Sequence, residues 1–161
     1  MQTVSSLSFE QQEDFSRFGK AFQESLCRLI LVDRPFADQI GEVLDFNFFE
    51  LKYLQLFCRK VYEYKDKYRA HPTADVMMTI LRTELEDENE AVATQVRSYF
   101  ARTLSKKGDE GNEYIKATSL DFCKKQKLKE AILKSIKLIK SSSFDEIKCE
   151  IDDALKLGAD N

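Results

Sequence analysis

A few side chains in this 161-residue sequence have the types that nucleophilic, redox or metal chemistry requires. The single histidine, His71, precedes a proline, and the cysteines Cys27, Cys58, Cys123 and Cys149 show no C-x-x-C spacing. Zinc sites and redox motifs usually bring such ligands close together in sequence, so neither kind of site is indicated. We interpret the cysteines as buried free thiols in a reducing compartment and His71 as a surface or helix-capping residue.

Two pairs of carboxylates, Glu84 with Glu88 and Glu86 with Glu90, are spaced four residues apart. This spacing puts both members on one helical face, where they could act as general acid and base, but a solvated acidic face is our preferred interpretation. The sequence has no GxSxG, GxxxxGK[ST] or GxGxxG motif and no Glu-x-x-His pair. We therefore predict that this chain is not an enzyme and that it holds no cofactor or metal of its own.

The strongest charge pattern lies near the C-terminus, in "KKQKLKEAILKSIKLIKSSSFDEIKCEIDDALKLG". Residues 124–140 contain seven lysines and one glutamate, whereas residues 143–161 contain six acids and two lysines. A nucleic-acid surface would favour arginines and interleaved aromatic residues, which the lysine segment lacks, and the net charge is −3. A solvated face is our preferred interpretation, and the alternative is a face for an acidic partner or nucleic acid, with candidate residues Lys124, Lys125, Lys127 and Lys134.

The elements that carry these residues are predicted to be helices throughout. Glycine and proline number only five and two, strand-like alternation is almost absent, and apolar residues recur every three or four positions. Asp33, Asp45 or Asn47, and Thr73 are expected N-caps. The spacing predicts helices over residues 18–32, 34–44, 47–70, 74–85, 86–104, 114–140 and 143–157.

Two of these helices carry apolar stripes that the rest of the chain does not account for. The helix over 114–140 would be about 40 Å long, which exceeds what a compact head covers, so we predict a protruding hairpin over about 88–141. Its stripe is Leu128, Ile132, Ile136 and Ile139. The last helix starts at a capping box over 143–146 and ends at Gly158, with the stripe Phe144, Ile147, Ile151 and Leu155.

The resulting organisation is all-α: a flexible arm (1–17), a helical head with a long antiparallel hairpin (18–141) and a short linker helix (142–161). No apolar run approaches the roughly 20 residues of a membrane span, and the N-terminus lacks the pattern of a signal peptide. We predict a cytoplasmic protein with no membrane contact.

This order of elements resembles the N-terminal domain of DnaB-family replicative DNA helicases. "ESLCRLILVDRPFADQIGEVLDFNFFELKYLQLFCRKVYEY" is similar to the opening helices of that domain, and "HPTADVMMTIL" is like its next helix. "CKKQKLKEAILKSIKLIKSSSFDEIKCEIDDALKLG" looks like the second arm of the hairpin and the linker helix. The ending "DALKLGADN" is most similar to T4-type phage helicases.

The resemblance implies a noncatalytic collar domain that pairs through its hairpins on a hexameric ring and recruits primase. Leu128, Ile132, Ile136 and Ile139 would then lie at the oligomer interface, and the stripe of the last helix would dock on a neighbouring motor domain. ATP and Mg would be bound only by a motor domain absent from this chain, and the full-length protein would be an ATP-dependent DNA helicase.

Further implied partners are a second copy of the chain, a helicase loader as a candidate, and DNA only in the assembled ring. In a virus, the location would be the cytoplasm of the host. Two alternatives remain open at this point: a small helical nucleic-acid-binding accessory protein, and a free-standing helical adaptor.

Overall fold

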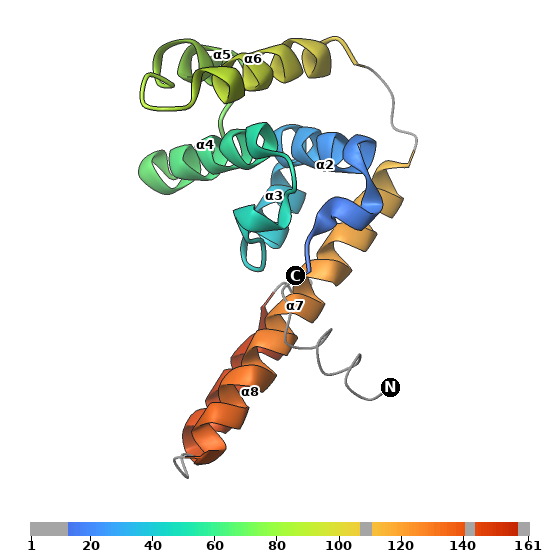
Figure 1. Cartoon of the computed structure of the whole chain (residues 1–161), viewed down its shortest axis with the longest axis vertical. Coiled ribbons are helices and arrows are strands. Elements are labelled where there is room, and N and C mark those ends of the chain that lie inside the picture. The colour runs from blue at the N-terminus through green and yellow to red at the C-terminus, as the bar shows by residue number, and fades with distance from the viewer. Residues whose placement is uncertain (1–12, 107–110, 141–143, 158–161) are drawn as a thin grey trace. The chain divides into compact units, whose positions relative to one another are not determined.

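The computed structural model of the chain describes residues 13–106, 111–140 and 144–157, which form helices joined by short turns and loops (Figure 1). No strand occurs among these residues, so the predicted all-α class is confirmed. The elements are η1 Phe15–Phe18, α2 Lys20–Val32, α3 Arg34–Gly41, η2 Phe46–Phe48, α4 Lys52–Tyr68, α5 Ala74–Thr83, α6 Glu90–Leu104, α7 Asn112–Lys140 and α8 Phe144–Lys156, where η marks a 3₁₀ helix.

These elements fall into two compact units. The head unit consists of Asp14–Asp38 and Phe46–Lys116, and the C-terminal unit consists of Met1–Glu13, Gln39–Asp45 and Ala117–Asn161. Helices α3 and α7 each contribute residues to both units. No helix within the described ranges has the length and hydropathy needed to cross a membrane.

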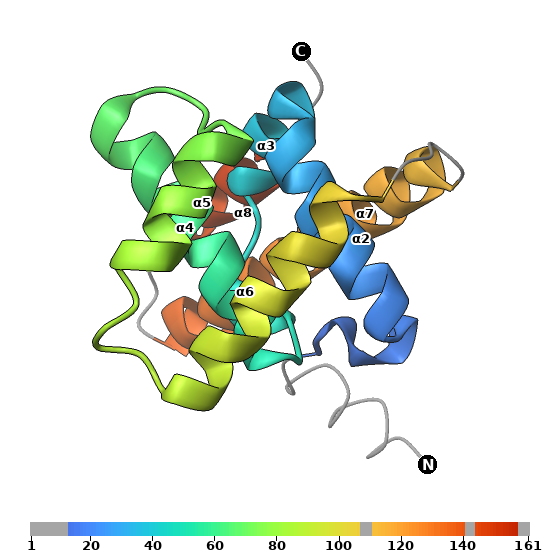
Figure 2. The ribbon, with the colours of Figure 1, turned by 90° about the horizontal axis from the view of Figure 1, so that it is seen from above.

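Helix α4 is the centre of the head unit. It contacts α2, α5 and α6, and α5 and α6 lie side by side over it (Figures 1 and 2). Helix α4 is apolar over a wide arc, so its apolar side chains can be buried only if other helices cover it from several sides. Its buried residues are Tyr53, Leu54, Leu56, Phe57, Cys58 and Val61.

Two predicted caps are confirmed and one is wrong. The Asp33 carboxylate accepts from the backbone N–H of Phe36 at 3.1 Å, and the Thr73 hydroxyl accepts from that of Val76 at 3.1 Å. Helix α4, however, begins after Leu51 with no side-chain cap, rather than at Asp45 or Asn47. The short η2 helix occupies that stretch instead, and the large rings of Phe48 and Phe49 on either side of its end are almost completely buried.

The acidic run 86–90 is likewise not a helical turn. Helix α6 begins only at Glu90, and the Asn89 side chain caps it by accepting from the backbone N–H groups of Ala91 and Val92. The four-residue spacing of the acids therefore does not place them on one helical face. Glu88 instead pairs with Arg59 of α4 at 3.4 Å.

The N-terminal arm ends earlier in the chain than the predicted residue 17. Residues 1–12 lie outside the described residues, but Asp14 caps η1 and Phe15 is completely buried. The Phe15 ring packs edge-on against Phe48 and Phe49, with centroids 5.8 and 5.1 Å away. The chain has therefore joined the head unit by Asp14, and the arm does not extend to residue 17.

In the C-terminal unit, α8 lies beside the second half of α7, where Lys134 Nζ is 3.5 Å from Glu150 Oε2 (Figure 1). Helix α7 buries only a few side chains and α8 buries none. Ser143 of the predicted capping box and Gly158 lie outside the described residues. The predicted hairpin pairs α6 with α7, and that pairing stays a prediction, because the most extensive contacts of α6 are with α4 and α5.

Candidate functional site

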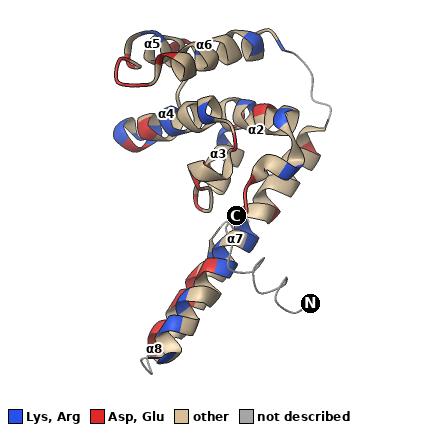
Figure 3. Ribbon diagram, viewed as in Figure 1, with Lys and Arg blue, Asp and Glu red and all other residues tan. Residues whose placement is uncertain are grey.

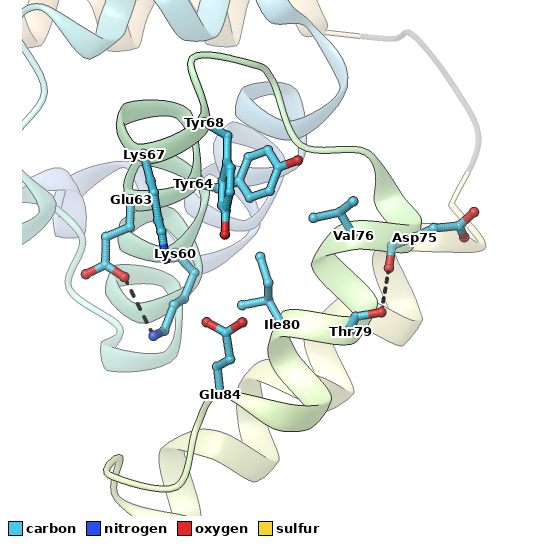
Figure 4. A pocket seen from close by; sticks show the side chains of 10 residues that line it. All are labelled: Lys60, Glu63, Tyr64, Lys67, Tyr68, Asp75, Val76, Thr79, Ile80 and Glu84. Carbon is cyan, nitrogen blue, oxygen red and sulfur yellow. Dashed lines mark hydrogen bonds and ion pairs between the residues drawn. The ribbon is translucent and has the colours of Figure 1, made fainter.

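An open groove of about 540 Å³ lies between α4 and α5 of the head unit (Figure 4). The last three turns of α4 form one wall, and α5 with the residue that follows it forms the other. We call it the α4–α5 groove. Its lining residues are Lys60, Glu63, Tyr64, Lys67, Tyr68, Asp75, Val76, Thr79, Ile80 and Glu84.

The groove has an aromatic wall that faces an aliphatic one (Figure 4). Tyr64 and Tyr68, one helical turn apart, have ring centroids 4.7 Å apart, and Lys67 Nζ lies 5.3 Å from the Tyr68 centroid. Tyr68 is 56% exposed. Val76 and Ile80 line the opposite side. Such a surface suits a ligand that presents an apolar side chain with a charged group next to it.

Some polar groups of the groove bond to each other or to the backbone. Lys60 Nζ is 3.6 Å from Glu63 Oε1, and the Thr79 hydroxyl donates to the backbone carbonyl of Asp75 at 3.3 Å. Asp75 and Glu84 stand on the α5 side, where they give that rim a negative charge. None of the ten lining residues is a histidine or cysteine, and Thr79 is already engaged with the backbone.

His71 ties the end of α4 to the end of α2. Its Nε2 lies 2.6 Å from the carbonyl oxygen of Leu31, which can only accept, and Lys65 Nζ is 3.0 Å from its Nδ1. Since an ammonium can only donate, the ring is in the tautomer that carries its proton on Nε2. Lys65 also reaches Asp38 at 2.6 Å. Leu31 lies in the last turn of α2, so His71 is a capping residue, one of the two roles predicted for it.

The cysteines differ from the prediction at one position. Cys27, Cys58 and Cys123 are buried and free, as expected, but Cys149 on α8 is exposed. Burial raises the pKa of the Cys27 thiol well above its usual value, so this side chain stays protonated. No cluster of three or more metal-ligating side chains occurs among the residues that the structure describes.

A polar cluster around Glu24 of α2 was not identified from the sequence. Arg102 of α6 donates to both carboxylate oxygens at 3.0 Å, and the Tyr53 hydroxyl of α4 donates at 2.6 Å. Burial alone would raise the pKa of Glu24, but the bonds from Arg102 and Tyr53 outweigh it and lower the pKa. Burial and the Glu24 carboxylate raise the pKa of Tyr53 to about 12. The sequence does not indicate this cluster because α2 and α6 are far apart in the chain.

The predicted interface stripe on α7 is only partly covered. Leu128 and Ile132 are half-buried, while Ile136 is 46% and Ile139 is 56% exposed. The stripe of α8 is divided in the same way: Ile147 and Ile151 are half-buried, whereas Phe144 and Leu155 are 69% and 63% exposed.

The lysine-rich segment of α7 is largely matched by acids of its own unit. Lys125 pairs with Asp121 at 3.0 Å, Lys127 with Glu130 at 3.7 Å and Lys134 with Glu150 of α8 at 3.5 Å. Figure 3 shows the resulting alternation of charges along α7 and α8. Lys124 is half-buried and forms no ion pair with the described residues. The acidic last helix thus neutralises part of the basic helix before it.

The chain matches no protein-family model, no curated protein and no solved structure. The resemblance to replicative helicases therefore stays an expectation based on the quoted stretches.

Proposed function

We propose that this chain is a noncatalytic N-terminal collar domain of a DnaB-family replicative DNA helicase, of the T4-type phage kind. In this proposal it mediates oligomerisation and recruits primase or other replisome partners in the host cytoplasm. ATP and Mg belong to a motor domain outside this chain. The chain then works by binding, and its important residues lie on surfaces rather than in a catalytic site.

The observation that supports this proposal best is the uncovered apolar surface of α7 and α8. Ile136, Ile139, Phe144 and Leu155 are all large and are between 46% and 69% exposed. Large apolar residues that gather on neighbouring helices favour a protein partner. The collar proposal assigns the α7 residues to a second collar domain and the α8 residues to a motor domain.

The finer arrangement in this proposal is a hairpin of α6 and α7 through which two collar domains pair. The outer face of α6 suits such an arrangement, since it exposes the small side chains Ala91, Thr94, Ser98 and Ala101. Small residues let helices approach closely, at the low end of the usual 8–10 Å interaxial distance.

Recruitment also requires a surface for a partner, and the α4–α5 groove is suitable. Its tyrosines and aliphatic residues can hold an apolar anchor, and the carboxylates of Asp75 and Glu84 favour a basic residue beside it. This is the chemistry we expect of the recruited segment.

The alternative of a nucleic-acid-binding accessory protein is less well supported, because Lys125, Lys127 and Lys134 already pair with acids. It predicts single-stranded DNA binding that survives about 200 mM salt and disappears when Lys124, Lys125 and Lys127 are neutralised. The collar proposal predicts only weak binding without sequence preference. Fluorescence anisotropy with a labelled oligonucleotide separates the two, and a free-standing adaptor would show neither DNA binding nor self-association.

Self-association is the direct test of the collar proposal. The double variant Ile136→Lys/Ile139→Lys should be monomeric at concentrations where the wild type is oligomeric, as measured by light scattering coupled to size exclusion. Each buried isoleucine contributes about 1.5–3 kcal/mol, so each substitution should weaken association about 10- to 100-fold. Tyr114→Lys is the matched control, since Tyr114 is 66% exposed at the opposite end of the same helix. A monomeric wild type, or an equal effect of Tyr114→Lys, would contradict the proposal.

A further inference from the structure

Two hollows in the head unit join into one trough beside α2 and the C-terminal turns of α6. One is about 370 Å³ and the other about 230 Å³, and they share Arg28, Thr103 and Lys106 as common lining residues. The larger hollow includes Glu24 and Arg102, and the smaller one extends past Val32 and Leu104 to the start of α5. We call the two together the α2–α6 trough.

The trough carries uncompensated positive charge. Glu24 is the only carboxylate among the described residues that line it, and Arg102 already holds both oxygens of that carboxylate at 3.0 Å. The side chains of Arg28 and Lys106 form no ion pair or hydrogen bond with the described residues. Because Arg102 is neutralised by Glu24, two cations of the described lining remain without an ion pair in the described part of the chain, one on α2 and one just after α6.

The same trough also exposes apolar surface. Val32 is 59% exposed and Leu104 is 43% exposed, and both line its smaller hollow. A phosphate backbone would satisfy the cations but would leave these two side chains in water. A ligand that satisfies both features must present carboxylates next to large apolar residues.

Helix α8 has this combination on its exposed side. Between Phe144 and Leu157 it carries five acids and two lysines. Phe144 and Leu155, 69% and 63% exposed, fall on the same helical face. The exposed Asp145 and Asp152 lie to one side of them, on an arc that also carries Lys148 and Lys156, and the helix as a whole keeps an excess of acids. The half-buried Ile147 and Ile151 form the other edge of the stripe, so the exposed edge is free to bind elsewhere.

We propose that the α2–α6 trough binds helix α8 of a second copy of this chain. Phe144 and Leu155 would pack on Val32 and Leu104, while Asp145 and Asp152 would approach Arg28 and Lys106. This contact goes beyond the collar function and uses none of the α7 residues on which that proposal rests. It does use Phe144 and Leu155, which the collar proposal assigns to a motor domain, so α8 can make only one of these two contacts at a time. Since it depends on charge, salt weakens it, whereas association through the α7 isoleucines is much less sensitive to salt.

Cys149 gives a direct test, because it is exposed on α8 and the other three cysteines are buried. A maleimide nitroxide is attached to Cys149 of unlabelled protein, which is then mixed with ¹⁵N-labelled Cys149→Ser protein. We expect intermolecular line broadening at the amides of residues 28, 32, 104 and 106. This broadening should persist when both copies carry Ile136→Lys/Ile139→Lys, so failure of the collar proposal and failure of this one can be told apart.

Charge reversal provides the second readout. Arg28→Glu/Lys106→Glu should weaken the contact roughly tenfold or more, and adding Asp145→Lys/Asp152→Lys should restore it. Lys52→Glu/Arg82→Glu is the matched control, since both residues are exposed and unpaired within the described part of the chain and the change of charge is the same. The ¹⁵N spectrum of each variant shows whether it is folded.

Absence of broadening in the trough at concentrations up to millimolar overturns the proposal. So does broadening confined to the α4–α5 groove, which would place α8 on a different surface. A charge-reversed pair that binds as tightly as the wild type, or loss that the swapped variant does not restore, also overturns it. If single-stranded DNA displaces the labelled copy, and if Val32→Ser leaves the binding of α8 unchanged, the proposal is also wrong. The trough would then be a phosphate site.

Discussion

Glu24 connects three helices of the head unit through one carboxylate. Arg102 and Tyr53 donate to its oxygens, and the Tyr99 hydroxyl donates to its backbone carbonyl at 2.6 Å. Arg102 is about half exposed, so its ion pair with Glu24 is partly screened by solvent. The cluster therefore contributes more to the fixed position of α6 on α2 and α4 than to overall stability.

A pH dependence follows from the lowered pKa of Glu24. A carboxyl group with a folded-state pKa below the usual 4.5 stabilises the fold above that value, and this contribution disappears as the pH falls through the folded-state pKa. We expect Arg102→Leu to reduce the free energy of unfolding by about 1 kcal/mol at pH 7. The difference from the wild type should shrink as the pH falls below about 4.5. Urea denaturation at several pH values measures it.

The control for this prediction is Arg82→Leu, which removes an exposed arginine with no ion pair among the described residues. It should change the free energy of unfolding little at any pH. A difference between Arg102→Leu and wild type that stays constant down to the most acidic pH would show that the ion pair is not its origin.

Among the elements, α8 depends most on what it contacts. It has 13 residues and buries none of them, whereas the 17-residue α4 buries six. An isolated helix shorter than about 12–15 residues is marginal in water, so α8 requires packing to persist. Its contacts with α7 include one exposed ion pair, Lys134 with Glu150, which adds little.

We therefore expect the amides of residues 144–157 to exchange with solvent much faster than those of α4 at low protein concentration. Protection should rise with concentration if α8 docks on a second copy. Hydrogen exchange read by mass spectrometry at two concentrations measures both effects, with α4 as the internal reference. Strong protection of α8 that does not depend on concentration would mean that its own chain already holds it firmly.

At the scale of the whole molecule, the cysteines report on the two units separately. Cys27 and Cys58 belong to the head unit, and Cys123 and Cys149 belong to the C-terminal unit. In the native protein we expect one fast-reacting thiol, Cys149, and three protected ones. A thiol reagent followed by peptide mass spectrometry assigns each reaction to its cysteine.

Increasing urea should then expose Cys123 before Cys27 and Cys58. The described helices of the C-terminal unit bury few side chains, while the head unit encloses a large aromatic core, so local opening should be easier in the former. Simultaneous exposure of all three buried thiols would indicate that the two units unfold together. Reaction of Cys58 first would contradict the assignment of α4 to the core.

The sequence by itself determined the features that depend on near neighbours. Apolar spacing placed the helices, and Asp33 and Thr73 were recognised as caps because an N-cap bonds to backbone groups two or three residues away. The stripes of α7 and α8 and their opposite charges were also visible, since helical periodicity decides which side chains share a face.

Only the tertiary structure decided what joins residues that are far apart in the chain. Glu24 and Arg102 are 78 positions apart, His71 and Leu31 are 40 apart, and no local pattern indicates either pair. The same holds for Phe15, whose burial depends on the rings of Phe48 and Phe49. Local rules fix backbone conformation within a few residues, whereas grooves, troughs and ion clusters arise from helix packing, in which many weak contacts between distant segments select one arrangement.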